Sequence, residues 1–476
     1  MNFITSLQRN SQINNSKGGK YYYSTYNSNL DLYAGLSRFN DEDEIINKFH
    51  NAYNEDRCLA LANLLFILDI KDGKGERRIF KILFKELCKM SPDDARIVLA
   101  YIGTLGRYDY ILEGLHTEIE DDVIELIRDT LKKDLIAEHP TLLAKWLPSH
   151  RTHNKPSKIA KYIINKLNIS EKDYRIILSR LRTKINIVEK NITNKTYENI
   201  NFEEVPAKAM LKYDYVFNTK VSDKFNDYKK MLKNGNTKIN TNGLFCYEII
   251  QKINYNVDRT ILNAMWENQK NIETGANNIL VVADTSGSMM CYGGIPYASS
   301  VGLAIYTAQR NKGIFKDKFI TFSENPILQE VKGLDIVDKF NSIKTIVANT
   351  NIDKVFELIL KSMKDAQSNI SDLPSHIVII SDMEFDCGIY SKNGTNFEGW
   401  KKAFKEEGYE LPKIIFWNVA GCTNGVPAIK NDNDCVMVSG FSTNLLENIF
   451  NLEEFSPLNQ MYTALEKYLN LIKIKE

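Results

Sequence analysis

The spacing of apolar residues changes along this chain and divides it into two kinds of predicted structure. From about residue 42 to residue 187, apolar side chains recur at helical intervals, as at Leu61, Leu64 and Leu65. Glycines interrupt this pattern at short intervals, so that one helix ends and another begins. The pattern predicts an α-helical, repeat-like array over residues 41–190.

Beyond residue 276, short continuous apolar runs alternate with helical segments. The predicted strands are residues 278–284, 318–322, 376–382, 413–419 and 435–438. The predicted helices between and after them are residues 298–310, 352–363 and 443–449. Strands that are apolar throughout, each followed by a helix, are typical of a parallel sheet covered on both faces. The C-terminal part is therefore predicted to be an α/β domain with a doubly wound parallel sheet.

Two further segments have weaker patterns. Residues 1–40 are rich in Asn, Ser, Tyr and Gly, which predicts an extended arm. Its Tyr21-Tyr22-Tyr23 run is predicted to pack the arm down, with stacking on bases or on a partner as the alternative. Residues 191–275 have frequent Asn and Lys and irregular apolar spacing, so we interpret them as a linking region.

The overall composition narrows the class of protein. The chain has 476 residues, 43% of them hydrophobic and 25% charged, which are the values of a globular protein with two or three domains. Its 7 cysteines are scattered without a C-x-x-C pair, which argues against a zinc knuckle or a disulfide framework. We find no apolar run long enough to span a membrane and no signal peptide. We therefore expect a cytoplasmic protein without a membrane partner.

Charge is balanced over the whole chain but not locally. Between residues 141 and 195, thirteen Lys and Arg face three acidic residues, a net charge of +10. A helical array with a basic face is a plausible track for RNA phosphates, whereas solvated lysines on the backs of helices are the alternative. The candidate RNA-binding residues are Lys145, Arg151, Lys155, Lys158, Arg175, Arg180, Arg182 and Lys184.

Hydroxyl and carboxylate side chains follow two of the predicted strands. Asp284, Ser286 and Ser288 come directly after the first strand, Asp382 ends a later one, and Thr350 precedes a helix between them. Ligands of parallel sheets bind beyond the carboxyl ends of the strands, so these loops can converge at one rim. Oxygen ligands of this kind suit Mg²⁺, which usually keeps several waters. The alternative is a capped strand-to-helix turn without a metal.

These residues carry a resemblance. The D-x-S-x-S motif of residues 284–288, with Thr350 and Asp382 downstream, resembles the metal-ion-dependent adhesion site (MIDAS) of von Willebrand A domains. The resemblance implies that residues 276–476 form such a domain and bind Mg²⁺ through these five side chains. One departure is Asn349, where many relatives carry Gly. Glu384 and Asp386 nearby are interpreted as a solvated acidic loop, with a second ion site as the alternative.

The rest of the chain resembles an uncharacterised family with a helical N-terminal region and a C-terminal von Willebrand A domain. The segments that carry this likeness are residues 68–77, 106–109, 145–149 and 205–206. The domain order is also distantly similar to that of the Ro autoantigen, whose TROVE module is a ring of helical repeats that binds RNA. The turn at Gly73-Lys74-Gly75 lacks the P-loop pattern and is interpreted as a flexible helix-helix turn.

Catalytic motifs are missing from the sequence. It contains neither a G-x-S-x-G elbow nor an H-E-x-x-H helix, and nothing near the predicted metal site resembles a general base. We therefore expect a non-enzymatic, Ro-like binding protein, with RNA on the basic helical region and Mg²⁺ in the C-terminal domain. The alternative is a metal-dependent protein-protein interaction module that offers the open metal position to an acidic protein ligand.

Overall fold

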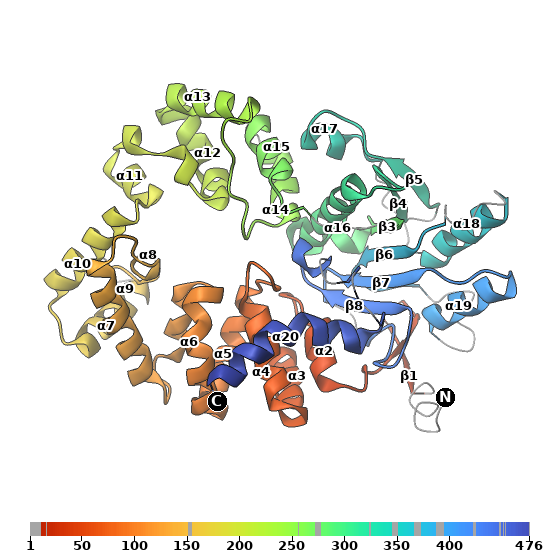
Figure 1. Ribbon diagram of the computed structural model, residues 1–476, viewed down its shortest axis with the longest axis horizontal. Coiled ribbons are helices and arrows are strands. Elements are labelled where there is room, and N and C mark those ends of the chain that lie inside the picture. Colours follow the sequence, from red (N-terminus) through yellow and green to blue (C-terminus); the bar gives the residue numbers. More distant parts are fainter. Residues whose placement is uncertain are drawn as a thin grey trace.

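The protein consists of a long arc of helices and a C-terminal α/β unit. The computed structural model describes residues 11–475, apart from residues 16, 151–154, 256, 272–277, 323–324, 345–350, 366–372, 387–394, 422–424, 447–448, 451 and 453. The helices are arranged around a common centre, and both ends of their arc lie on the α/β unit (Figure 1).

The elements of the arc follow one another in chain order. They are α2 (Ser28–Gly35), α3 (Glu42–Glu55), α4 (Arg57–Leu68), α5 (Arg77–Met90), α6 (Pro92–Leu105), η1 (Tyr108–Gly114), α7 (Glu120–Ile136), α8 (Leu143–Trp146), α9 (Lys155–Leu167), α10 (Glu171–Lys184), α11 (Val188–Asn194), α12 (Ala207–Lys220), α13 (Ser222–Lys233), α14 (Cys246–Ile250) and α15 (Arg259–Glu267). Side-chain caps stabilise the N-terminal ends of some of these helices. The side chains of Asp41 and Asp56 accept hydrogen bonds from backbone N–H groups in the first turns of α3 and α4.

The helical pattern continues beyond the predicted array. Residues 191–275, interpreted as an irregular linking region, contain α12 to α15. An aromatic cluster holds α12 and α13 together: the ring of Phe202 lies 5.1 Å from that of Phe217 and 4.9 Å from that of Phe225. Since these contacts join different elements of the segment, the irregular local spacing did not reveal them.

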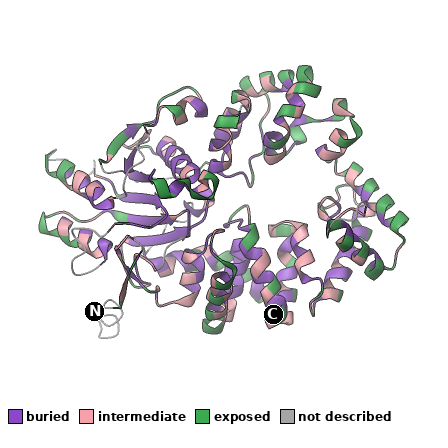
Figure 2. Ribbon diagram, turned by 180° about the vertical axis from the view of Figure 1, so that it is seen from behind, coloured by how far each residue is buried: buried purple, intermediate pink, exposed green. Residues whose placement is uncertain are grey.

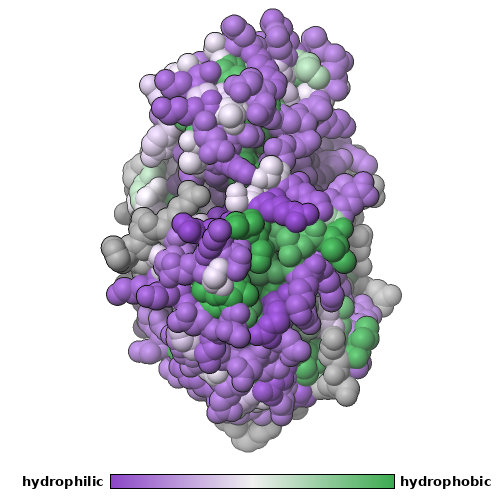
Figure 3. Space-filling model, turned by 90° about the vertical axis from the view of Figure 1, so that its left-hand side faces the viewer, coloured by the Kyte–Doolittle hydropathy of each residue, from purple (hydrophilic) through white to green (hydrophobic). Residues whose placement is uncertain are grey.

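The outer side of the arc, formed by α7 to α11, is mostly hydrophilic. Figure 3 shows the largest apolar patch of this view near its middle. Among the described residues of α7 to α10 and the turns that join them, the large exposed apolar side chains are Ile136, Leu142 and Ile176.

The two ends of the arc meet on the α/β unit. At the first end, α4 packs against the C-terminal helix α20 (Pro457–Lys475), and at the other end α14 packs against α16 (Cys291–Arg310). Arg38 joins both ends, because its guanidinium lies 2.8 Å from the carboxylate of Glu76 and donates to the hydroxyl of Tyr247 at 2.7 Å. The arc is therefore closed through side-chain contacts.

The α/β unit is built on a six-stranded sheet. Its strands are β3 (Ile279–Asp284), β4 (Lys318–Phe322), β5 (Ile327–Glu330), β6 (His376–Ser381), β7 (Lys413–Asn418) and β8 (Cys435–Ser439). Their order is β5-β4-β3-β6-β7-β8, and all neighbours are parallel except β4 and β5. Every residue of β3 and β6 is buried, as the purple strands of Figure 2 show. The predicted strands are confirmed, and the edge strand β5 was not predicted.

Helices cover the sheet. One of them, α16, packs against β3, β4 and β6. The helices α18 (Ile352–Asp365) and α19 (Asn396–Glu406) pack on each other, with the rings of Phe356 and Trp400 stacked 3.9 Å apart. The shorter α17 (Ile336–Asn341) contacts α15 of the arc.

The N-terminal arm packs on the α/β unit. It forms a hairpin of β1 (Gln12–Asn14) and β2 (Lys20–Tyr22), and Tyr22 forms a β-bridge with Val426. The side chains of Tyr21 and Tyr22 are each 1% exposed, whereas Tyr23 is 76% exposed. The prediction that the tyrosines pack the arm down is confirmed for the first two. In the part of the chain that the structure describes, every helix is too short or too polar to cross a membrane.

Candidate functional site

The sheet places two acidic side chains next to each other. Asp284 ends β3, Asp382 follows β6, and these two strands are parallel neighbours with Ala283 opposite Ile380. The strands that follow β3 in the chain, β4 and β5, extend the sheet on one side of β3. The strands β6, β7 and β8 extend it on the other side. The switch point of the sheet therefore lies between β3 and β6. Ligands of open α/β sheets bind at the carboxyl ends of the strands at such a point.

A serine hydroxyl connects the two carboxylates. Ser381 Oγ donates to Asp284 Oδ2 at 2.7 Å and lies 3.4 Å from Asp382 Oδ1. The other oxygen of Asp284 accepts from the backbone N–H of Ser286 at 2.9 Å, and Asp382 Oδ1 accepts from the N–H of Glu384 at 3.0 Å. Ser381 was not among the predicted site residues, although its place directly before Asp382 at a strand end is a usable signal.

Both carboxylates are buried. Asp284 is 0% exposed and Asp382 is 3% exposed. Burial raises the pKa of Asp284 to about 6, and the charge of Asp382 acts in the same direction. Two buried carboxylates that repel each other are stabilised by a cation between or beside them. Their environment therefore fits a positively charged ligand.

The two serines of the predicted motif lie between the buried carboxylates and the solvent. Ser286 is buried, Ser288 at the start of the short helix η5 (Gly287–Met290) is exposed, and their Oγ atoms are 3.1 Å apart. Hydroxyl and carboxylate oxygens together are a donor set that a hard cation accepts. Thr350, the fifth predicted ligand, lies outside the described residues, which resume at Asn351 before α18.

Carboxylates are few at this rim. The described residues contain no group of three or more His, Cys, Asp or Glu side chains that could hold a metal ion. Glu384 is only 8% exposed, so the interpretation of a solvated acidic loop is wrong for this residue. A cation at Asp284 and Asp382 would therefore need hydroxyl and water oxygens to complete its ligands.

The N-terminal hairpin holds the loop that follows Asp382. The hydroxyl of Tyr21 donates to the carbonyl of Met383 at 2.5 Å, and Asn15 Nδ2 donates to the carbonyl of Phe385 at 2.8 Å. Burial raises the pKa of Tyr21, so its hydroxyl remains a proton donor. The arm therefore positions the loop beside the two carboxylates, a role that its sequence did not reveal.

The structure divides the candidate RNA-binding residues into two groups. Lys158, Arg175 and Arg180 are exposed and Lys145 is half-buried, so these four remain open to a ligand. Arg151 and the side chain of Lys155 lie outside the part of the chain that the structure describes.

The remaining two cations contact main-chain carbonyls. The guanidinium of Arg182 donates to the carbonyls of Ala144 at 2.8 Å and Leu147 at 2.7 Å. Lys184 Nζ donates to the carbonyl of Ala137. Arg182 thereby ties α10 to α8, and Lys184 ties it to the end of α7, so a structural role accounts for their positions.

Comparisons with known proteins divide the chain at the same place as the fold. Residues 278–468 match a domain of unknown function, DUF7788, and residues 115–281 match a second, DUF2828. The two matches meet at the start of β3. The chain is also 28% identical over 499 residues to "Uncharacterized protein L728" of Acanthamoeba polyphaga mimivirus, which covers 95% of this chain and 87% of that protein.

Proposed function

We propose that this protein is a non-enzymatic, Ro-like binding protein that holds RNA on its basic helical region and Mg²⁺ in a von Willebrand A-type domain. The metal ligands in this proposal are Asp284, Ser286, Ser288, Thr350 and Asp382. The observation that carries the metal part is the pair of buried carboxylates, joined by the hydroxyl of Ser381, at the switch point of the sheet.

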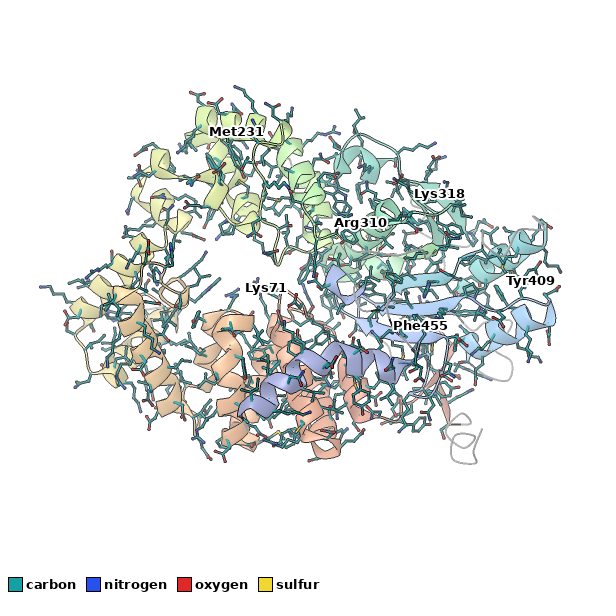
Figure 4. The ribbon with its side chains drawn as sticks, in the orientation of Figure 1. Lys71, Met231, Arg310, Lys318, Tyr409 and Phe455 are labelled. Atoms are coloured by element: carbon teal, nitrogen blue, oxygen red, sulfur yellow. The ribbon has the colours of Figure 1, made fainter. Side chains whose placement is uncertain are left out.

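Several features of the arc support the RNA part of the proposal. The stretch with a net charge of +10 folds into α8 to α11, and its cations Lys158, Arg175 and Arg180 are exposed. Figure 4 shows Lys71 at the tip of the α4–α5 turn, near the centre around which the helices are arranged. A closed arc with exposed cations offers a preformed surface to a phosphate backbone.

RNA affinity of the full chain is expected to fall steeply with salt, because each neutralised phosphate releases counterions. Reversing charge at Lys158→Glu and Arg180→Glu together should weaken binding about tenfold and flatten the salt dependence. The measurement is fluorescence anisotropy with a labelled RNA between low and high salt. Arg182 and Lys184 stay unchanged, since their carbonyl contacts stabilise the fold.

The matched control is the double variant Lys361→Glu and Lys402→Glu, which changes the charge equally at exposed positions on α18 and α19. It should bind RNA as the wild type does. Wild-type protein that fails to bind RNA, or binds it without salt dependence, would rule out the RNA part of the proposal.

A metal-dependent protein interaction is the second candidate function. It is favoured by the exposure of Ser288 beside the buried Asp284, which leaves the rim open on the solvent side. A partner would contribute a Glu or Asp oxygen to the bound ion. We expect EDTA and the Asp284→Ala variant each to release such a partner in a pull-down. Partners that stay bound under both conditions would contradict this function.

A further inference from the structure

A basic pocket lies between four helices of the arc. It has a volume of about 640 Å³ and is lined by residues of α8, α10, α11 and α12, together with the segment after α8. The short helix α8 lies on the inner side of α9 and α10 (Figure 1). Each of the four helices contributes at least one cation to the lining, and the five are Lys145, Arg175, Arg182, Lys190 and Lys212.

Polar contacts hold the walls of the pocket in place. Arg182 donates to two carbonyls around α8, as described above, and to Ser149 Oγ at 2.7 Å. The hydroxyl of Tyr174 donates to the carbonyl of Pro148 at 2.9 Å. Lys190 Nζ donates to Thr183 Oγ1 and thereby fastens α11 to α10. The pocket is therefore formed before any ligand enters, which reduces the ordering that binding requires.

Other cations of the pocket remain available for a ligand. Arg175 is exposed and forms no ion pair with any described residue. Lys145 Nζ lies 5.7 Å from the ring centroid of Trp146, and Lys212 Nζ lies 4.8 Å from that of Tyr213. Since Glu189 is the one acidic residue in the described lining, the pocket is strongly positive. It favours a ligand with a phosphate group.

An aromatic ring and an acceptor without a donor also line the pocket. Trp146 is half-buried, and the guanidinium of Arg107 lies over its ring at 3.7 Å. Glu189 Oε2 is buried and accepts no hydrogen bond from the residues that the structure describes. A buried acceptor without a donor is unfavourable, so a ligand that brings an N–H or O–H would be favoured there.

We propose that this pocket binds one nucleotide of single-stranded RNA. Its phosphate lies toward Arg175 and Lys212, its base lies against Trp146, and a ribose hydroxyl or base amino group donates to Glu189. The inference rests on the proposed RNA-binding function and assigns it a site. A paired, stacked base of a duplex cannot enter such a pocket, whereas an unpaired base can.

The test measures binding of the full chain to a short single-stranded RNA and to an RNA duplex. Single-stranded RNA should bind at least tenfold more tightly. Trp146→Ala should weaken its binding about tenfold, because the base loses its stacking surface. Arg175→Glu should also weaken it about tenfold, because the phosphate loses a cation and meets a negative charge. Trp146→Phe, which keeps an aromatic ring, should retain most of the affinity. The control is Lys172→Glu, at an exposed position of the same helix outside the pocket lining, with less than a twofold effect.

Glu189→Ala separates a built site from simple charge attraction. If the cations only attract phosphate, removing a negative charge should raise the affinity for RNA. If Glu189 accepts from the nucleotide, the same change should lower it. Pocket variants that bind RNA like Lys172→Glu, or a duplex that binds as tightly as the single strand, would overturn the pocket while RNA binding stands. Wild-type protein that binds neither RNA would end both proposals.

Discussion

Mg²⁺ is expected to raise the unfolding temperature of the wild-type protein and to leave that of an Asp284→Asn variant unchanged. The ion would offset the repulsion between the buried carboxylates of Asp284 and Asp382. At about 100 times its dissociation constant, a ligand of the folded state adds about 2.7 kcal/mol to the free energy of unfolding. Asparagine keeps the size and an acceptor oxygen for the N–H of Ser286, so the variant should fold without the ion.

The measurement is thermal unfolding with Mg²⁺ or EDTA, followed by circular dichroism. Glu330→Gln is the matched control, since this acid lies on the edge strand β5 and pairs with Lys332 on the surface. Its response to Mg²⁺ should equal that of the wild type. A wild-type protein that is indifferent to Mg²⁺, or an Asp284→Asn variant that still responds, would contradict the assignment of the metal site.

Stability is expected to rise with pH above 7 because of Lys74. This lysine is 1% exposed, and its Nζ donates to the carbonyl of Tyr33 and to Ser439 Oγ. Burial lowers the pKa of Lys74 to about 7, against a partial opposing effect of Glu76. Between pH 7 and about 10, the unfolded chain binds this proton and the folded chain does not. The free energy of unfolding therefore increases by about 1.4 kcal/mol per pH unit from this group.

The effect is isolated by comparison with Lys74→Met, which has no group to titrate. Urea unfolding at pH 7 and pH 9 should show a gain for the wild type that exceeds the gain for Lys74→Met by about 2 kcal/mol, because Lys74 is half protonated in the folded protein at pH 7. Lys71→Met is the control, because it removes an exposed lysine of the same turn. Equal pH dependence in the wild type and Lys74→Met would mean that Lys74 stays charged in the folded protein.

The sequence by itself determined the framework of the α/β unit. The predicted strands at residues 279–284 and 376–381 correspond to β3 and β6, and the helix predicted from residue 352 is α18. The two strands were predictable because each is a short apolar run that ends in an acidic residue. The apolar run predicts a buried strand, and the acidic residue marks the position where it ends. The same reasoning placed Asp284 and Asp382 at one rim of the sheet, which the parallel pairing of β3 and β6 confirms.

Other features depended on contacts between residues that are tens to hundreds of positions apart. The turn around Lys74 was interpreted as a flexible helix-helix turn, yet Lys74 is buried against Ser439 of β8. Arg180 and Arg182 are indistinguishable as charges in the sequence, but only Arg182 is held by carbonyls of the α8 segment. A local sequence pattern predicts which residues are buried, but it does not predict which distant residues they pack against.

The closure of the arc was decided by tertiary structure alone. Arg38 meets Glu76 and Tyr247, which come from opposite ends of the helical region, and α20 returns from the C-terminus to pack on α4. The N-terminal hairpin reaches the loop after Asp382 in the same way, through Tyr21 and Met383. Hydrophobic spacing specifies each helix and strand separately. Their order around a common centre depends on side-chain complementarity between elements, and this appears only when the whole chain is packed.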